Sequence, residues 1–208
     1  MDFRNAKELL KVCQEQGLSI SAVMLQRELT EGEQDPEETD RKMDRVLEIM
    51  KSAASTPIHT PVKSMGGLIG GEAKKISDHK DTGKGLCGDL LERAVIYAMA
   101  TLETNASMGV IVASPTAGSA GIVPGLLLAL QETYDLSDEQ IKQGLYNASA
   151  IGYLAMRNAT VAGAVGGCQA EVGIASAMAA SATVELMGGS PEQSLAAAST
   201  VLMNMLGL

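Results

Sequence analysis

The chain has 208 residues, of which 46% are hydrophobic and 20% charged, a composition that permits a buried core. Its 16 Lys and Arg against 25 Asp and Glu give a formal net charge of −9, which excludes a basic surface for nucleic acid. Aromatic residues make up only 2%, and the apolar residues are mainly aliphatic, with 12 Met and 22 Gly. This balance favours close-packed helices over β-sandwiches or barrels, so we expect an all-α protein.

The N-terminus and the cysteines indicate the compartment. The first residues, MDFRNAKELLK, carry charges where a secretion signal requires an apolar run. Cys13, Cys87 and Cys168 are too few and too widely spaced for a disulfide framework and are typical of a reducing compartment. The long uncharged stretch from Thr104 to Gln131 contains prolines and glycines that would break a membrane span. We predict a cytoplasmic protein with no membrane partner.

The N-terminal quarter of the chain is predicted to be helical. Apolar residues at helical spacing indicate a helix over 2–17, and a second short helix is expected after Ser21. An acidic link over 30–38 contains Asp35-Pro36, a capping residue followed by proline, which predicts the start of a third helix.

The third helix is expected to end before 55–63, STPIHTPVK, whose two prolines indicate a linker. After this stretch Gly, Ala and Ser dominate the composition. We therefore predict an N-terminal helical appendage over 1–54, a linker over 55–63 and a helical core over 64–208.

Within the core, apolar spacing and capping residues predict a bundle of helices joined by Gly-rich loops. Its central helix is expected to be the nearly uncharged Ala/Ser-rich stretch, because small residues on every side permit burial on every side. The helices are expected over 86–101, 138–156 and 169–187, and from Ser190 to the C-terminus.

The last residues, VLMNMLGL, continue the apolar pattern to the end of the sequence. Either Gly207 ends the helix, or the chain is cut inside a larger domain. We favour the cut and expect the C-terminal part of the core to be missing.

Three familiar kinds of site find no support in the sequence. The GKGLCG sequence at 83–88 has the glycine spacing of a dinucleotide loop but lacks the preceding buried strand, so a turn before a helix is expected. His59 and His79 both lie in polar surroundings, which supports neither a His-based zinc site nor a serine-type catalytic triad, and we expect both in exposed loops.

Two glycine-rich elements are candidates for chemistry. Hydroxyls and glycines over 114–121, SPTAGSAG, before a helix start near Ile122, would suit a carboxylate or phosphate, although an ordinary turn is the alternative. Cys168 follows a double glycine at a predicted helix start, a position that favours a thiolate able to bind metal. The alternative for Cys168 is a small buried apolar residue.

These elements, with MGGLIGGEAKK (65–75), RNATVAGAVGGCQAEVG (157–173) and LMGGSPEQS (186–194), closely resemble the alpha chain of bacterial iron–sulfur L-serine dehydratases. The resemblance covers about residues 1–208 and is strongest after 65. It implies a lyase that eliminates water from L-serine to give pyruvate and ammonia, with roles in amino-acid catabolism and gluconeogenesis. It also implies a separate beta chain as partner.

The resemblance implies a metal-binding site for a [4Fe–4S] cluster, held by three cysteines, whose open iron acts as a Lewis acid on the substrate. Cys168 matches the first ligand, while the other two belong to a CDP…PC stretch that follows NMLGL in relatives. Cys13 and Cys87 match no ligand. We therefore expect this chain alone to lack the cluster and to be inactive. The residues expected to bind the substrate carboxylate are Ser114, Thr116, Ala117, Gly118, Ser119 and, more weakly, Lys75.

Two other functions remain open. A related iron–sulfur lyase would act on L-cysteine and release sulfide. A non-catalytic helical interaction module would instead use the acidic N-terminal helices and the 12 Met to bind partners. The helices at 2–54 are candidates for docking the beta chain or a second copy of the chain, or they simply cover the core.

Overall fold

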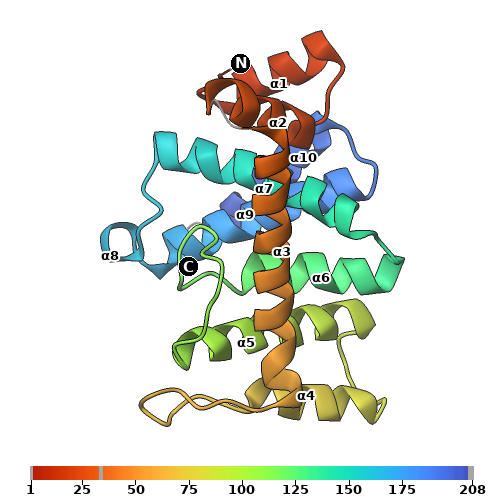
Figure 1. Ribbon diagram of the computed structural model, residues 1–208, viewed down its shortest axis with the longest axis vertical. Coiled ribbons are helices and arrows are strands. Elements are labelled where there is room, and N and C mark those ends of the chain that lie inside the picture. Colours follow the sequence, from red (N-terminus) through yellow and green to blue (C-terminus); the bar gives the residue numbers. More distant parts are fainter. Residues whose placement is uncertain (1, 33–34, 206–208) are drawn as a thin grey trace. The chain divides into compact units, whose positions relative to one another are not determined.

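The computed structural model describes residues 2–32 and 35–205, and every regular element within these ranges is an α-helix (Figure 1). This confirms the all-α prediction. The chain forms two compact units, Met1–Arg45 with Asp138–Leu208, and Val46–Ser137. We call them the terminal unit and the middle unit and describe each by itself. The N-terminal helices therefore belong with the last third of the chain.

The first two helices begin and end where local signals place them. The Asn5 side chain caps α1 (Ala6–Gln16) by accepting from the Glu8 N–H at 3.0 Å, and Gly17 ends it with φ of +66°. The α2 helix (Ile20–Glu31) is capped by Ser19, two residues before Ser21, after which the sequence predicted it to begin.

The third helix, α3 (Pro36–His59), starts at the predicted position, where the Asp35 side chain accepts from the Glu38 N–H at 2.9 Å. The expected end before residue 55 was wrong, because the helix continues through Pro57 to His59. Proline has no N–H to offer the Ala53 carbonyl. The Thr104 hydroxyl donates to that carbonyl instead, at 2.9 Å, so the freed acceptor is satisfied and the predicted linker 55–63 is helical over its first half.

The terminal unit is built on α7 (Asp138–Asn158), α9 (Cys168–Leu186) and α10 (Pro191–Met205), with α9 packed against both of the others. The buried residues of α9 include Ala175, Ala177, Ala179 and Ala182 and face several directions, as expected for the Ala/Ser-rich central helix. The predicted start of the last helix is confirmed, because Ser190 and Gln193 bond to each other's backbone N–H groups.

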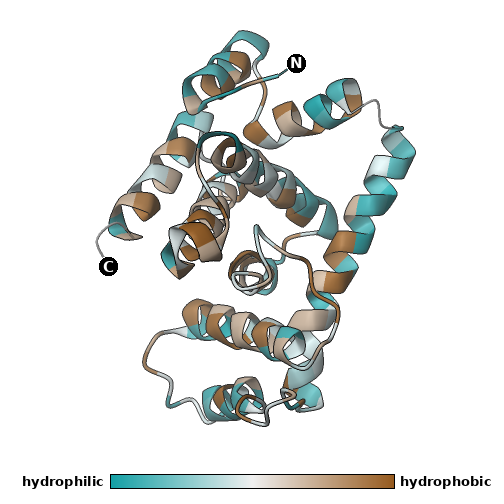
Figure 2. Cartoon of the chain, turned by 90° about the vertical axis from the view of Figure 1, so that its left-hand side faces the viewer, coloured by the Kyte–Doolittle hydropathy of each residue, from teal (hydrophilic) through white to brown (hydrophobic). Residues whose placement is uncertain are grey.

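Phe3, which precedes α1, joins Leu9 of α1 and Ile20 and Val23 of α2 in a buried cluster that includes Tyr146 of α7. Figure 2 shows hydrophobic and hydrophilic residues on different faces of many of the helices, as amphipathic packing requires. The α2–α7 contact thus makes the N-terminal segment part of the core of this unit.

The middle unit contains α4 (Glu72–Asp81), α5 (Asp89–Ala106) and α6 (Ile122–Tyr134). The α5 and α6 helices approach closely because Gly121 and Gly125 face α5: a Cβ at Gly121 would lie 2.5 Å from the Ala98 carbonyl oxygen. The sequence predicted α5 and the start of α6, but it missed α4 and the single turn α8 (Gly163–Gly166).

His59 and His79 are exposed as expected, but they lie in helices α3 and α4 rather than in loops. No helix among the described residues is both long and apolar enough to cross a membrane. Part of the predicted acidic link (33–34) and Gly207 lie outside the described residues.

Candidate functional site

Cys168 is the first residue of α9, and its thiol is exposed. The preceding Gly167 has φ of +78°, a conformation that only glycine adopts without strain, and this turn starts the helix. Exposure excludes the alternative of a buried apolar residue. The thiol at the start of α9 is therefore accessible to a ligand or a reagent.

The other two cysteines differ from Cys168. Cys13 is buried in the terminal unit, and burial, with the charges of Glu185 and Glu192, raises the pKa of its thiol to about 11. Cys87 is exposed but belongs to the middle unit. Among the residues that the structure describes, no group of three His, Cys, Asp or Glu side chains could hold a metal ion. These residues therefore do not fit a cluster by themselves.

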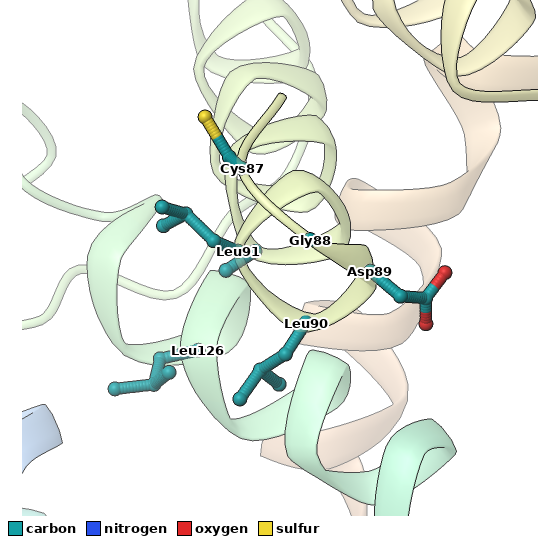
Figure 3. Close-up of a pocket in the computed structure, with 7 residues that line it drawn as sticks. Cys87, Gly88, Asp89, Leu90, Leu91 and Leu126 are labelled. Carbon is teal, nitrogen blue, oxygen red and sulfur yellow. The ribbon is translucent and has the colours of Figure 1, made fainter. Parts of the chain in front are cut away.

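Cys87 lines a shallow cleft of about 340 Å³ at the start of α5 (Figure 3). The other lining side chains are mostly apolar, including Leu90, Leu91 and Leu126. A cleft of this kind offers few groups that could orient a small polar amino acid, so it is a weak candidate for a substrate site.

The 114–119 turn holds itself together through its own hydroxyls. The Ser119 side chain is 1% exposed, and its Oγ lies within hydrogen-bonding distance of the Ser114 carbonyl (3.2 Å) and the Thr116 hydroxyl (3.3 Å). The Asn105 side chain, at the end of α5, donates to the Ala117 carbonyl at 3.0 Å. Ser119 is thus used to shape the turn.

The turn presents its residues unequally. Ala117 and Gly118 are exposed and Thr116 is half-buried. Ser114 is buried, and its Oγ has no hydrogen-bond partner among the described residues. A buried hydroxyl without a partner is costly, so Ser114 is the strongest candidate in this turn for contact with a polar ligand.

Lys75 lies in the first turn of α4 and is exposed. Nearby, two carboxylates that the sequence analysis did not single out meet the start of the same helix. Glu103 of α5 is 1% exposed and accepts from the Ala73 N–H at 2.8 Å. Glu72 accepts from the Gly70 N–H at 2.6 Å, and this bond contributes most to lowering the pKa of its carboxyl.

The second oxygen of Glu103 is buried without a partner in the described part of the chain. The sequence offered one signal for Glu103: it is a charged residue on a helix that otherwise buries Ile96 and Ala100, directly before the uncharged stretch. The structure thus brings the 114–119 residues, Lys75 and Glu103 into one unit, while Cys168 belongs to the other.

Comparison with known proteins assigns the whole chain to one group. The family model for the serine dehydratase alpha chain matches residues 15–208. A probable L-serine dehydratase alpha chain of Bacillus subtilis is 47% identical, over 99% of this chain and 68% of its own length. The L-serine dehydratase alpha chain of Peptoniphilus asaccharolyticus is 42% identical, over 99% of this chain and 70% of its own. An L-serine dehydratase of Streptomyces coelicolor is 37% identical over 99% of this chain but only 45% of its own length.

Proposed function

Because this chain belongs to the serine dehydratase alpha-chain family, we propose that it forms the alpha-chain core of an L-serine ammonia-lyase. The overall reaction removes the α-proton and the β-hydroxyl of L-serine as water and leaves 2-aminoacrylate. This enamine becomes an imine, which water hydrolyses to pyruvate and ammonia.

The exposed thiol of Cys168 at the start of α9 carries the proposal. We assign Cys168 as one ligand of a [4Fe–4S] cluster. Since the described residues lack a complete ligand set, the remaining ligands would have to come from outside them. The Gln169 side chain donates to the Met205 carbonyl at 3.4 Å, so the end of α10 lies beside the start of α9.

The 114–119 turn is the proposed contact for the substrate carboxylate. The Ser114 hydroxyl is buried without a partner among the described residues, and Ala117 and Gly118, next to Thr116, are exposed. Hydroxyl and backbone N–H donors of this kind orient a carboxylate. Lys75 is a further candidate because its ammonium group is exposed in the same unit.

The alpha-chain assignment also implies a partner and a setting. We propose that a beta chain binds this chain, that L-serine is the substrate, and that a homo-oligomer forms. The product pyruvate suits a cytoplasmic role in amino-acid catabolism and gluconeogenesis.

The test uses the full-length polypeptide that contains this chain, reconstituted anaerobically with iron, sulfide and the beta chain. Pyruvate formation from L-serine and the brown absorbance of the cluster are measured for the unmodified protein, Cys168→Ser and Cys87→Ser. Cys87 is the control because it is also an exposed cysteine near the start of a long helix, two residues before α5 begins. We expect Cys168→Ser to lose both signals and Cys87→Ser to keep both.

Two results would contradict the proposal. Sulfide release from L-cysteine that exceeds pyruvate formation from L-serine would indicate that L-cysteine is the substrate. Absence of iron and of both activities in the reconstituted protein would indicate a non-catalytic interaction module instead.

A further inference from the structure

The side chain of Asp2 connects the N-terminal segment to two helices of the terminal unit. Its Oδ1 accepts from Arg27 Nε of α2 at 3.1 Å and from the Tyr153 hydroxyl of α7 at 2.9 Å. Its Oδ2 accepts from Arg157 at 3.1 Å. We call Asp2, Arg27, Tyr153 and Arg157 the Asp2 cluster.

The cluster is organised around the Tyr153 ring. The Arg27 guanidinium lies 3.9 Å from the ring centroid and that of Arg157 lies 5.5 Å away, while the Phe3 ring packs T-shaped against it with the two centroids 5.4 Å apart. Phe3, the neighbour of Asp2 in the chain, is fully buried, and this anchors the backbone beside Asp2. A carboxylate bound by two guanidinium groups that also contact one aromatic ring is held much more firmly than a single surface ion pair.

A second contact lies next to the cluster. The Asn158 side chain donates to the Arg4 carbonyl and to the Leu154 carbonyl, each at 2.8 Å. Arg157 and Asn158 are the last two residues of α7. Residues 2–4 therefore hold the end of α7 through two groups, the Asp2 carboxylate and the Arg4 backbone carbonyl.

Residues 159–167 connect the end of α7 to Cys168 at the start of α9. Hydrogen bonds within the segment are local, such as those from the Ala162 N–H to the Thr160 hydroxyl and from the Val165 N–H to the Ala162 carbonyl, and its single turn α8 contacts α9. The position of the segment therefore depends on α9 and on the end of α7. The start of α9 fixes one end of 159–167, and the end of α7 fixes the other.

We propose that Asp2 is a positioning residue that fixes the end of α7 and thereby the 159–167 segment before Cys168. Residues 2–4 then do more than cover the core, because they position the end of α7. Whether this positioning affects catalysis rests on the proposed function, whereas its effect on residues 159–167 does not.

The test compares amide hydrogen exchange in the unmodified chain, Asp2→Asn and Asn158→Ala. The Asp2→Asn amide matches the carboxylate in shape, but its NH₂ group must face one of the cationic donors. We expect exchange over 159–167 to become about tenfold faster, since a hydrogen bond to a charged group contributes roughly that factor. Asn158→Ala, which removes the other contact and leaves Asp2 intact, is expected to act in the same direction.

Glu15→Gln is the control, because Glu15 is an exposed carboxylate of α1 in the same unit whose ion pair, with Lys11 at 3.6 Å, lies within its own helix. It should leave exchange over 159–167 unchanged. If both test variants leave the exchange of 159–167 as in the unmodified chain, the proposal is wrong.

Activity and iron content separate this proposal from the proposed function. In reconstituted enzyme, Asp2→Asn is expected to lower the iron retained per chain, while Glu15→Gln retains the normal amount. If the unmodified enzyme forms no pyruvate, the proposed function fails, but the exchange result still decides whether Asp2 positions the segment.

Discussion

Replacing Thr104 with valine should destabilise the second half of α3. Valine has nearly the same shape as threonine but cannot donate to the Ala53 carbonyl, and Pro57 has no N–H to take over that bond. A buried carbonyl without a partner costs about 1–3 kcal/mol. Ala53 is 2% exposed, so little water can compensate, and we expect a loss of about 2 kcal/mol in the free energy of unfolding.

The assay is urea unfolding followed by circular dichroism, with hydrogen exchange used to locate the change in α3. A double-mutant cycle tests the cause directly, because Pro57→Ala restores an N–H that can bond to the Ala53 carbonyl. In that background Thr104→Val should cost less than about 0.5 kcal/mol.

Thr200→Val provides the control, since the Thr200 hydroxyl also bonds to a helix carbonyl, that of Ala196, but no proline removes the backbone donor there. It should change the free energy of unfolding by less than about 0.5 kcal/mol. An equal cost of Thr104→Val with and without Pro57 would refute the explanation for the continuous helix.

Three further outcomes follow from burial and charge. The pKa of the Asp2 carboxyl is lowered to about 2, chiefly by the Tyr153 hydrogen bond. The ionised carboxyl therefore contributes its full stabilisation above the ordinary pKa of an Asp and loses it as the pH falls toward 2. The difference in unfolding free energy between the unmodified chain and Asp2→Asn should shrink over that pH range. Gly121→Ala should lower the unfolding free energy by about 1–3 kcal/mol, because its Cβ would lie 2.5 Å from a backbone oxygen of α5, whereas Gly66→Ala, with open space around the Cβ, should not. At neutral pH, iodoacetamide should label the exposed Cys168 and leave Cys13 unlabelled, as measured by mass spectrometry. The reason is that Cys13 is buried and the pKa of its thiol is raised to about 11. Equal labelling of the two cysteines would contradict the burial of Cys13.

Most helices could be predicted from the sequence because their signals are local. Capping residues such as Asp35 and Ser190 act within one turn, so the spacing that predicts them also determines their contacts. The Asn5 cap was missed, and α1 begins at Ala6 rather than at residue 2. The end of α3 could not be predicted in this way. Whether Pro57 stops the helix depends on a hydroxyl from Thr104, 47 residues later in the chain, and no local pattern contains that information.

In the candidate site, too, features that depend on neighbouring residues could be predicted, and features that depend on packing could not. The start of α9 at Cys168 follows from the double glycine before it, whereas the sequence left the exposure of the thiol open, and the structure shows it exposed. Within the 114–119 turn the sequence could not rank the hydroxyls, because serine serves equally well as a ligand contact and as a bond within a turn. Packing separates the two roles: Ser119 is occupied by the Ser114 carbonyl and the Thr116 hydroxyl, while the Ser114 hydroxyl is left without a partner among the described residues.

This difference makes the two serines unequal in any binding experiment. Ser119→Ala should loosen the turn and weaken binding of every ligand, because it removes hydrogen bonds that hold the backbone at Ser114 and Thr116. Ser114→Ala removes no bond within the described turn, so the turn should keep its shape and only a ligand that uses the Ser114 hydroxyl should lose affinity. Comparing L-serine kinetics of the two variants in reconstituted enzyme, with hydrogen exchange over 114–121 as the measure of turn order, separates a contact with substrate from a structural role. Faster exchange in Ser114→Ala than in Ser119→Ala would mean that these assignments are reversed.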